Sequence, residues 1–143
     1  MSRELRLAVV FGLLMFAGSF LLPAVKPAIT HLPGYQAAWN IFTLPFRGMP
    51  EPLWRKLVLV LIWPTNLLVL TGYVRLLAGK PAWTRWLAIY GLVGQFYWFF
   101  DPDISTREFG VGYWVWVFSG IVLVVIAVMA GNRVSPPAPA QPA

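Results

Sequence analysis

The sequence predicts an all-α polytopic membrane protein, and three features lead to that fold class. First, 59% of the 143 residues are hydrophobic and only 11% are charged, whereas soluble domains carry about 25% charged residues. Second, apolar residues gather in four stretches, at residues 7–25, 57–78, 83–100 and 111–130. Third, each stretch approaches the roughly 20 residues that a helix needs to cross a bilayer core. We therefore expect four transmembrane helices in one antiparallel bundle.

The first stretch is expected to remain in the protein as a transmembrane helix. Arg3 and Arg6 precede it as they would precede a secretory signal, but it is slightly longer than a usual signal core. Pro23, Lys26 and Pro27 stand where a small-residue cleavage site would be. The two prolines also predict the end of the helix, because neither can donate an amide hydrogen to a continuing helix.

A short interfacial helix is expected near residues 35–46, between the first and second spans. Apolar residues recur there at helical spacing and polar residues fall on the other side. The apolar set is Tyr35, Ala38, Trp39, Phe42 and Phe46, and the polar set is Gln36, Asn40 and Thr43. The rings of Tyr35 and Trp39 would then lie at headgroup depth. This helix is interpreted either as a lid or docking surface, or as a loop helix that seals the bundle.

The second and third spans each carry one feature that predicts their geometry. The second span begins after Arg55 and Lys56, and Pro64 near its middle predicts a kink, because proline removes one helical hydrogen bond. The third span reaches full length only if the side chain of Arg85 extends to the interface.

The fourth span is predicted to begin with a capping box. Ser105 is followed by Glu108, and in this motif each side chain satisfies a free amide at the helix start. A helix is therefore expected over residues 106–130. The tail at 132–143 is rich in Pro and Ala and has nothing to bury, so we expect it to be disordered. The chain thus divides into a transmembrane domain at 1–131 and a tail.

The distribution of basic residues favours cytoplasmic termini. With four spans, both termini and the connection between spans two and three share one side. That side carries Arg3, Arg6, Arg75, Lys80, Arg85 and Arg133; the other carries Lys26, Arg47, Arg55, Lys56 and Arg107 with four of the five acidic residues. The first set lies in short segments close to the spans, where the positive-inside rule acts.

The candidate intramembrane polar site consists of Pro64, Asn66 and Gln95. An uncharged polar group at membrane depth must find a partner, because water is absent there. In an antiparallel pair of helices the depths of the two amides would differ by about 6 Å, which a kinked helix could bridge. The pair is interpreted as a binding site in the bundle or as an interhelical hydrogen bond, worth on the order of 1 kcal/mol.

Other candidate sites are less specific. His31, Asp101 and Asp103 form an outer-face polar cluster whose ligands would suit a divalent cation. Their spacing matches no metal motif, so we expect no metal site. The chain has one histidine and no cysteine, which excludes bis-histidine haem ligation, disulfides and thiolate metal sites. We expect no catalytic residues and no cofactor.

Two aromatic clusters end the third span and begin the fourth. They comprise Phe96, Tyr97, Trp98, Phe99 and Phe100, and Tyr113, Trp114, Trp116 and Phe118. Both fall at the same membrane face, where aromatic rings serve as interfacial anchors. A pocket for a lipid, quinone or pigment is the alternative interpretation.

The order of several motifs resembles that of an uncharacterised group of small bacterial four-span membrane proteins. These motifs are Leu22-Pro23, Gly34-Tyr35 with Ala38, an Asn in span two, and Gly112-Tyr113-Trp114 with Trp116. The resemblance covers most of residues 5–130. It implies a location in the bacterial inner membrane and provides no catalytic residues to transfer.

The sequence favours a non-enzymatic membrane accessory or interaction protein. Small residues that let helices approach closely support this interpretation: Ala8 with Gly12, Ala127 with Gly131, Gly91 and Gly94. The expected partners are the lipid bilayer and another membrane protein or a second copy. Nucleic acid is not expected, because the basic residues are scattered. The alternative is a small-molecule or lipid carrier built on the polar site between spans two and three.

Overall fold

The computed structural model describes residues 2–25, 32–43, 52–100 and 109–132, and this part of the chain is mostly helical. The all-α class expected from the sequence is confirmed. In chain order the described elements are α1 (Arg3–Ser19), β1 (Pro23–Val25), β2 (Leu32–Pro33), α2 (Gly34–Thr43), α3 (Leu53–Ile62), α4 (Thr65–Leu77), α5 (Thr84–Tyr97) and α6 (Val111–Asn132).

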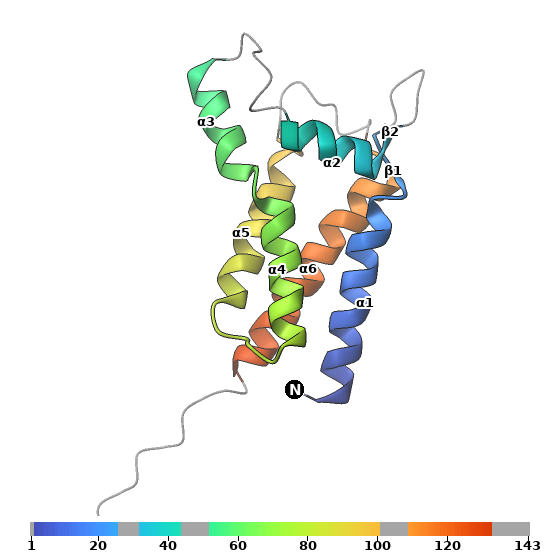
Figure 1. Cartoon of the computed structure of the whole chain (residues 1–143), viewed down its shortest axis with the longest axis vertical. Coiled ribbons are helices and arrows are strands. Elements are labelled where there is room, and N and C mark those ends of the chain that lie inside the picture. Colours follow the sequence, from blue (N-terminus) through green and yellow to red (C-terminus); the bar gives the residue numbers. More distant parts are fainter. Residues whose placement is uncertain (1, 26–31, 44–51, 101–108, 133–143) are drawn as a thin grey trace, which may run out of the picture.

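The helices α1, α4, α5 and α6 pack against one another along their lengths (Figure 1). α6 contacts the other three, and α1 packs most extensively against it. α5 lies against both α4 and α6. The start of α1, the α4–α5 connection and the end of α6 all lie at one end of the molecule (Figure 1).

α1 presents a narrow inward stripe to its neighbours. Its buried residues follow one another at spacings of four and three: Leu5, Val9, Gly12, Phe16 and Ser19. Such spacing places them on one face of a helix. The Ser2 hydroxyl caps the start of α1 by accepting from the amide of Leu5 at 3.4 Å.

The first predicted span was expected to run to residue 25, and this bound is wrong because α1 ends at Ser19. The segment that follows is held by backbone bonds to α2 instead. The amide of Gly34 donates to the carbonyl of Leu22, and that of Tyr35 to the carbonyl of Phe20, each at 2.8 Å. β1 then pairs antiparallel with β2 in a short ribbon, which the sequence did not predict.

The short helix expected near residues 35–46 is present as α2. It crosses the end of the molecule opposite the start of α1 (Figure 1), and the side chains of Tyr35 and Trp39 are exposed. Residues 44–46 lie outside the described residues, so the end of this helix is not compared.

The kink predicted at Pro64 is confirmed. α3 ends at Ile62 and α4 begins at Thr65, with Trp63 and Pro64 between them. α3 leans away from the axis of α4 (Figure 1) and buries only Leu59. The two carbonyls at the break accept from hydroxyl groups: Tyr90 of α5 donates to Leu61, and Thr65 donates to Ile62 at 2.6 Å.

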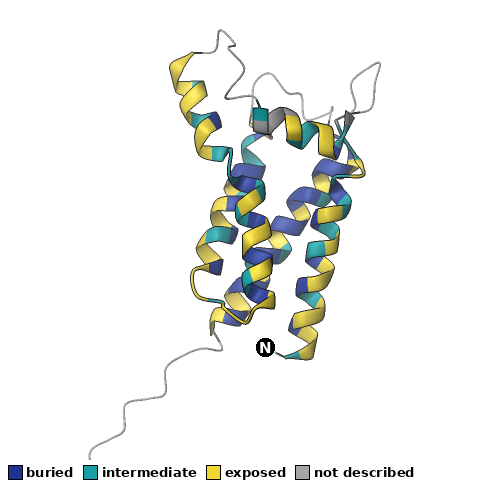
Figure 2. Ribbon diagram, in the orientation of Figure 1, coloured by how far each residue is buried: buried dark blue, intermediate teal, exposed yellow. Residues whose placement is uncertain are grey.

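Among the described residues, two helical segments are long and apolar enough to cross a membrane. They are Leu53–Leu77, which combines α3 and α4, and Val111–Asn132, which is α6. α1 has 17 residues and α5 has 14. The outward faces of all these helices are exposed (Figure 2), and large apolar side chains line them. This surface would suit a hydrocarbon solvent better than water.

Candidate functional site

The predicted polar residues Asn66 and Gln95 are brought together through Trp116 of α6. The Trp116 indole Nε1 donates to the Oδ1 of Asn66 on α4 at 2.9 Å. The Nε2 of Gln95 on α5 donates to the Trp116 carbonyl at 3.0 Å. Trp116 therefore joins three helices with its two polar groups. The sequence analysis considered a direct pairing of the two amides, whereas in the structure each of them bonds to this third residue.

Three further hydroxyl groups extend this network. Ser119 donates from Oγ to the Trp116 carbonyl at 2.6 Å, so that carbonyl accepts two hydrogen bonds. Tyr113 donates to the backbone carbonyl of Gln95 at 3.0 Å. Tyr73 of α4 donates to the carbonyl of Ser119. We name this set the Trp116 network: Asn66, Tyr73, Gln95, Tyr113, Trp116 and Ser119.

One buried polar atom of the Trp116 network has no hydrogen-bond partner. The Gln95 side chain is fully buried, and its Oε1 meets no donor. The amide cannot turn to relieve this, because a carbonyl only accepts and the Trp116 carbonyl requires the nitrogen. Oε1 instead faces the backbone of Gly120, where an added Cβ would overlap it. An unpaired buried acceptor costs about 1–3 kcal/mol, so this position would favour a small hydrogen-bond donor.

Glycines form the closest helix contacts around the network. A Cβ on Gly12 of α1 would lie 2.5 Å from the Tyr73 hydroxyl, and one on Gly72 of α4 would lie 2.8 Å from Leu123. On α5, a Cβ on Gly91 would lie 2.6 Å from Val69, and one on Gly94 would overlap the Thr65 hydroxyl. Such approaches are typical of tightly packed transmembrane helices.

The small-residue pairs named from the sequence differ in their outcome. Gly91 and Gly94 are buried contacts of α5, and Gly12 is buried while Ala8 is half-buried. Ala127 and Gly131 make no such shared contact within the chain, because Gly131 is exposed and an added Cβ there would meet nothing within 4 Å. The physical reason is that Gly131 lies in the last turn of α6, beyond its buried stripe.

The aromatic clusters pack on one another. Phe109 stacks on Tyr113 with ring centroids 3.9 Å apart and an interplanar angle of 10°. Phe99 stacks on Phe109 with an interplanar angle of 23°, and Trp114 makes edge contacts with both of these rings. These rings join the end of α5 to the start of α6. Ring-to-ring packing of this kind strengthens the contact between these two segments.

The outer-face cluster of His31, Asp101 and Asp103 lies outside the described residues, as do Ser105 and Glu108 of the expected capping box. Within the ranges that the structure describes, no three His, Cys, Asp or Glu side chains gather as metal ligands would.

Sequence reasoning missed Tyr73, Tyr113 and Ser119 as parts of the network. Each is a hydroxyl-bearing residue in an apolar helix, and each needs a partner where water is absent. That signal was available in the sequence. Trp116 was assigned to an aromatic belt, since nothing local shows that its indole reaches α4.

Comparison of the chain with known protein families, with curated proteins and with solved structures finds no match.

Proposed function

We propose that this chain is a four-span integral membrane protein of the bacterial inner membrane that serves as a non-enzymatic accessory or interaction subunit. Its spans are α1, the kinked pair α3 and α4, α5, and α6, arranged as an antiparallel bundle. The termini face the cytoplasm. We also propose that the chain is related to the small bacterial four-span membrane proteins that its sequence resembles.

The observation that carries the proposal is the division between inward polar groups and outward apolar faces. Four of the hydrogen bonds of the Trp116 network join neighbouring helices. The exposed positions of the same helices carry Leu67, Val93 and Phe118. A scaffold protein has this arrangement, because its polar groups join its own helices and its apolar faces contact lipid or another helix.

The two shorter helices fit the span assignment when their flanks are included. α1 is about 26 Å long at roughly 1.5 Å per residue. α5 is shorter, but the amides of Phe99 and Phe100 donate to the carbonyls of Phe96 and Tyr97, so the chain keeps turning to residue 100. Trp83 at one end and Phe100 at the other provide apolar rings at interfacial depth.

Single-cysteine labelling tests the topology, since the chain contains no cysteine. Cysteines at Ser2 and Lys80 should react with a membrane-impermeant maleimide only after the cytoplasmic side is opened. One at Lys56 should react in intact spheroplasts. Labelling of Ser2 and Lys80 from opposite sides would disprove the four-span arrangement.

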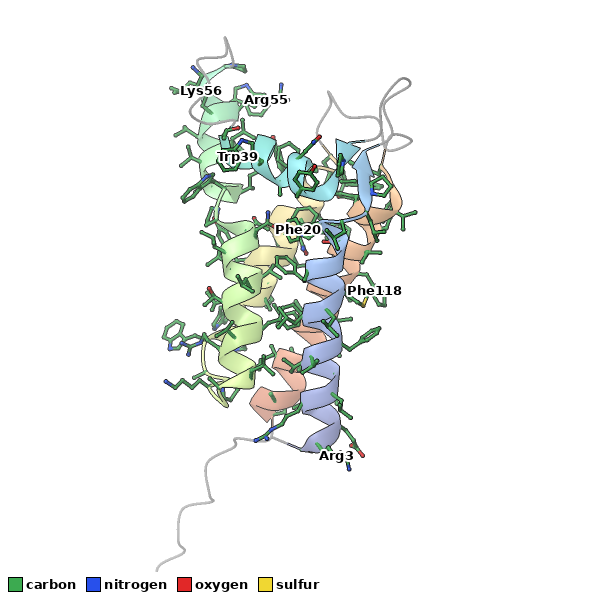
Figure 3. All side chains as sticks on the ribbon, turned by 45° about the vertical axis from the view of Figure 1, so that its right-hand side comes forward. Arg3, Phe20, Trp39, Arg55, Lys56 and Phe118 are labelled. Atoms are coloured by element: carbon green, nitrogen blue, oxygen red, sulfur yellow. The ribbon has the colours of Figure 1, made fainter. Side chains whose placement is uncertain are left out.

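Site-specific photo-crosslinking in the native membrane tests the interaction role. A photoreactive residue replacing Phe118, which points outward from α6 (Figure 3), should give a discrete adduct with a second copy or another membrane protein. The matched control is Leu123 of the same helix, which is fully buried and should crosslink only within the chain. A chain that migrates alone in mild detergent and gives no outward adduct would count against the proposal.

A small-molecule or lipid carrier is the second candidate, favoured by the unpaired Oε1 of Gln95 and the half-buried side chain of Asn66. A hydrogen-bond donor of a ligand could bind to the Oε1 of Gln95. Asn66→Leu and Gln95→Leu should then abolish uptake or release of the ligand while leaving the chain in the membrane. If both variants leave every transport phenotype unchanged, the carrier role is excluded.

A further inference from the structure

The connection between α4 and α5 is an ordered turn held by its own hydrogen bonds. The Nη2 of Arg75 donates to the carbonyl of Ala82 at 2.7 Å. The hydroxyl of Thr84 donates to the carbonyl of Lys80 at 3.1 Å, and the amide of Lys80 donates to the carbonyl of Arg75 at 2.8 Å. These bonds fix the backbone from which the charged side chains of the turn project.

Trp83 adopts an unusual conformation in this turn. Its φ is 66°, and among the described residues it is the only non-glycine residue with a positive φ. This region is unfavourable for a bulky side chain. Burial does not compensate for it, because 73% of the Trp83 surface is exposed. Strained residues of this kind gather at functional positions, and here the strain directs an indole outward at the end of the molecule.

Basic and aromatic side chains surround Trp83. Lys80 and Arg85 are exposed, and the Arg85 guanidinium carbon lies 5.2 Å from the centroid of the Trp86 ring. Trp86 is itself 56% exposed. We name Lys80, Trp83, Arg85 and Trp86 the basic turn.

The charge around the basic turn is strongly one-sided. Arg3 and Arg6 begin α1 at the same end of the molecule, and Glu4 is the acidic residue there among the described residues. Arg55 and Lys56 lie at the opposite end (Figure 3). An anion beside the basic turn would meet the two exposed cations Lys80 and Arg85. It would also lie near Arg75, whose guanidinium is bonded within the turn.

We propose that the basic turn binds the phosphate headgroups of anionic phospholipids. Lys80 and Arg85 would contact the phosphate, and the two indoles would lie beside the glycerol region, where amphipathic rings collect. The exposed apolar faces of α4 and α5 would accommodate the acyl chains. Basic residues at a membrane surface attract anionic lipids in this manner. The inference rests on the proposed insertion of the chain in a bilayer.

The experiment uses the full chain in nanodiscs that contain equal amounts of phosphatidylglycerol and phosphatidylcholine. Native mass spectrometry after release measures the ratio of the two lipids that stay bound. The variant K80Q/R85Q removes both exposed positive charges of the basic turn. The matched control R55Q/K56Q removes two charges at the opposite end, and K80R/R85K preserves the charges in the turn.

The wild-type chain should retain phosphatidylglycerol in excess. K80Q/R85Q should lower this preference by roughly fivefold for each charge removed, while R55Q/K56Q and K80R/R85K should leave it unchanged. Equal losses in K80Q/R85Q and R55Q/K56Q would show general electrostatic attraction and overturn the proposal. Displacement of the lipid by inorganic phosphate at constant ionic strength would identify free phosphate as the ligand and would also overturn it.

The failure of this inference is distinguishable from the failure of the proposed function. A chain that enters phosphatidylcholine nanodiscs but shows no lipid preference refutes only the lipid site. A chain that enters no bilayer refutes the membrane assignment on which both proposals depend.

Discussion

Gly94→Ala should weaken the contact between α4 and α5, although alanine is the better helix former. The added Cβ would overlap the Thr65 hydroxyl and lie 3.2 Å from Thr65 Cβ and 3.3 Å from its Cγ2. Thr65 cannot easily turn aside. Its side chain is β-branched and therefore stiff, and its hydroxyl is bonded to the carbonyl of Ile62 at the kink.

The expected size of the effect follows from two opposing terms. Overpacking a closely filled interface costs about 1–3 kcal/mol, and one overlap together with two tight contacts to a stiff side chain favours the upper part of that range. Replacing Gly by Ala inside a helix gains about 1 kcal/mol. The free energy of unfolding should therefore fall by about 1–2 kcal/mol, the difference between these two terms.

The matched control is Gly18→Ala in α1, where an added Cβ meets nothing within 4 Å. This variant should be as stable as the wild type or more stable. Reversible SDS titration in mixed micelles, followed by fluorescence of the eight tryptophans, measures both. The double variant G94A/T65A separates the clash from other effects, because removing Oγ1 and Cγ2 should reduce the cost of Gly94→Ala by about 1 kcal/mol. The packing argument is wrong if Gly94→Ala is as stable as Gly18→Ala. It is also wrong if Gly94→Ala lowers the free energy of unfolding as much in the Thr65→Ala background as in the wild type.

Three other substitutions test single hydrogen bonds and the kink. Trp116→Phe removes the donor to Asn66 and should lower the free energy of unfolding by about 0.6–1.7 kcal/mol in the same SDS titration; an unchanged midpoint would contradict a role for this bond. Tyr90→Phe leaves the Leu61 carbonyl without that hydroxyl and should destabilise the chain by a similar amount, about 1 kcal/mol, with faster amide exchange at the kink as its readout. Pro64→Ala restores an amide hydrogen and should straighten the helix, so spin-label distances between α3 and α1 should change; constant distances would show that packing alone sets the bend.

The features that the sequence predicted well are local in the chain. Pro64 interrupts hydrogen bonding within its own helix, so the break between α3 and α4 could be placed to the residue. Gly12, Gly91 and Gly94 could be assigned to interfaces because small residues in an apolar helix are typical of close packing. The short α2 could be recognised from its own periodicity.

The features that sequence reasoning missed depend on contacts between distant segments. α1 was expected to continue to residue 25, but the carbonyls of Phe20 and Leu22 bind amides at the start of α2. No periodicity encodes such backbone pairing. Asn66 and Gln95 were compared by depth as two partners, and that comparison could not show that an indole from a third helix joins them.

The extensive packing of α1 against α6 has a consequence for biosynthesis. The inward stripe of α1, with Val9 and Phe16, is synthesised before α6, the helix that covers most of it. The nascent chain must therefore keep this stripe half-covered until α6 has been made. A truncation before residue 111 should leave α1 without its main neighbour, and such fragments should be degraded faster than the full-length chain.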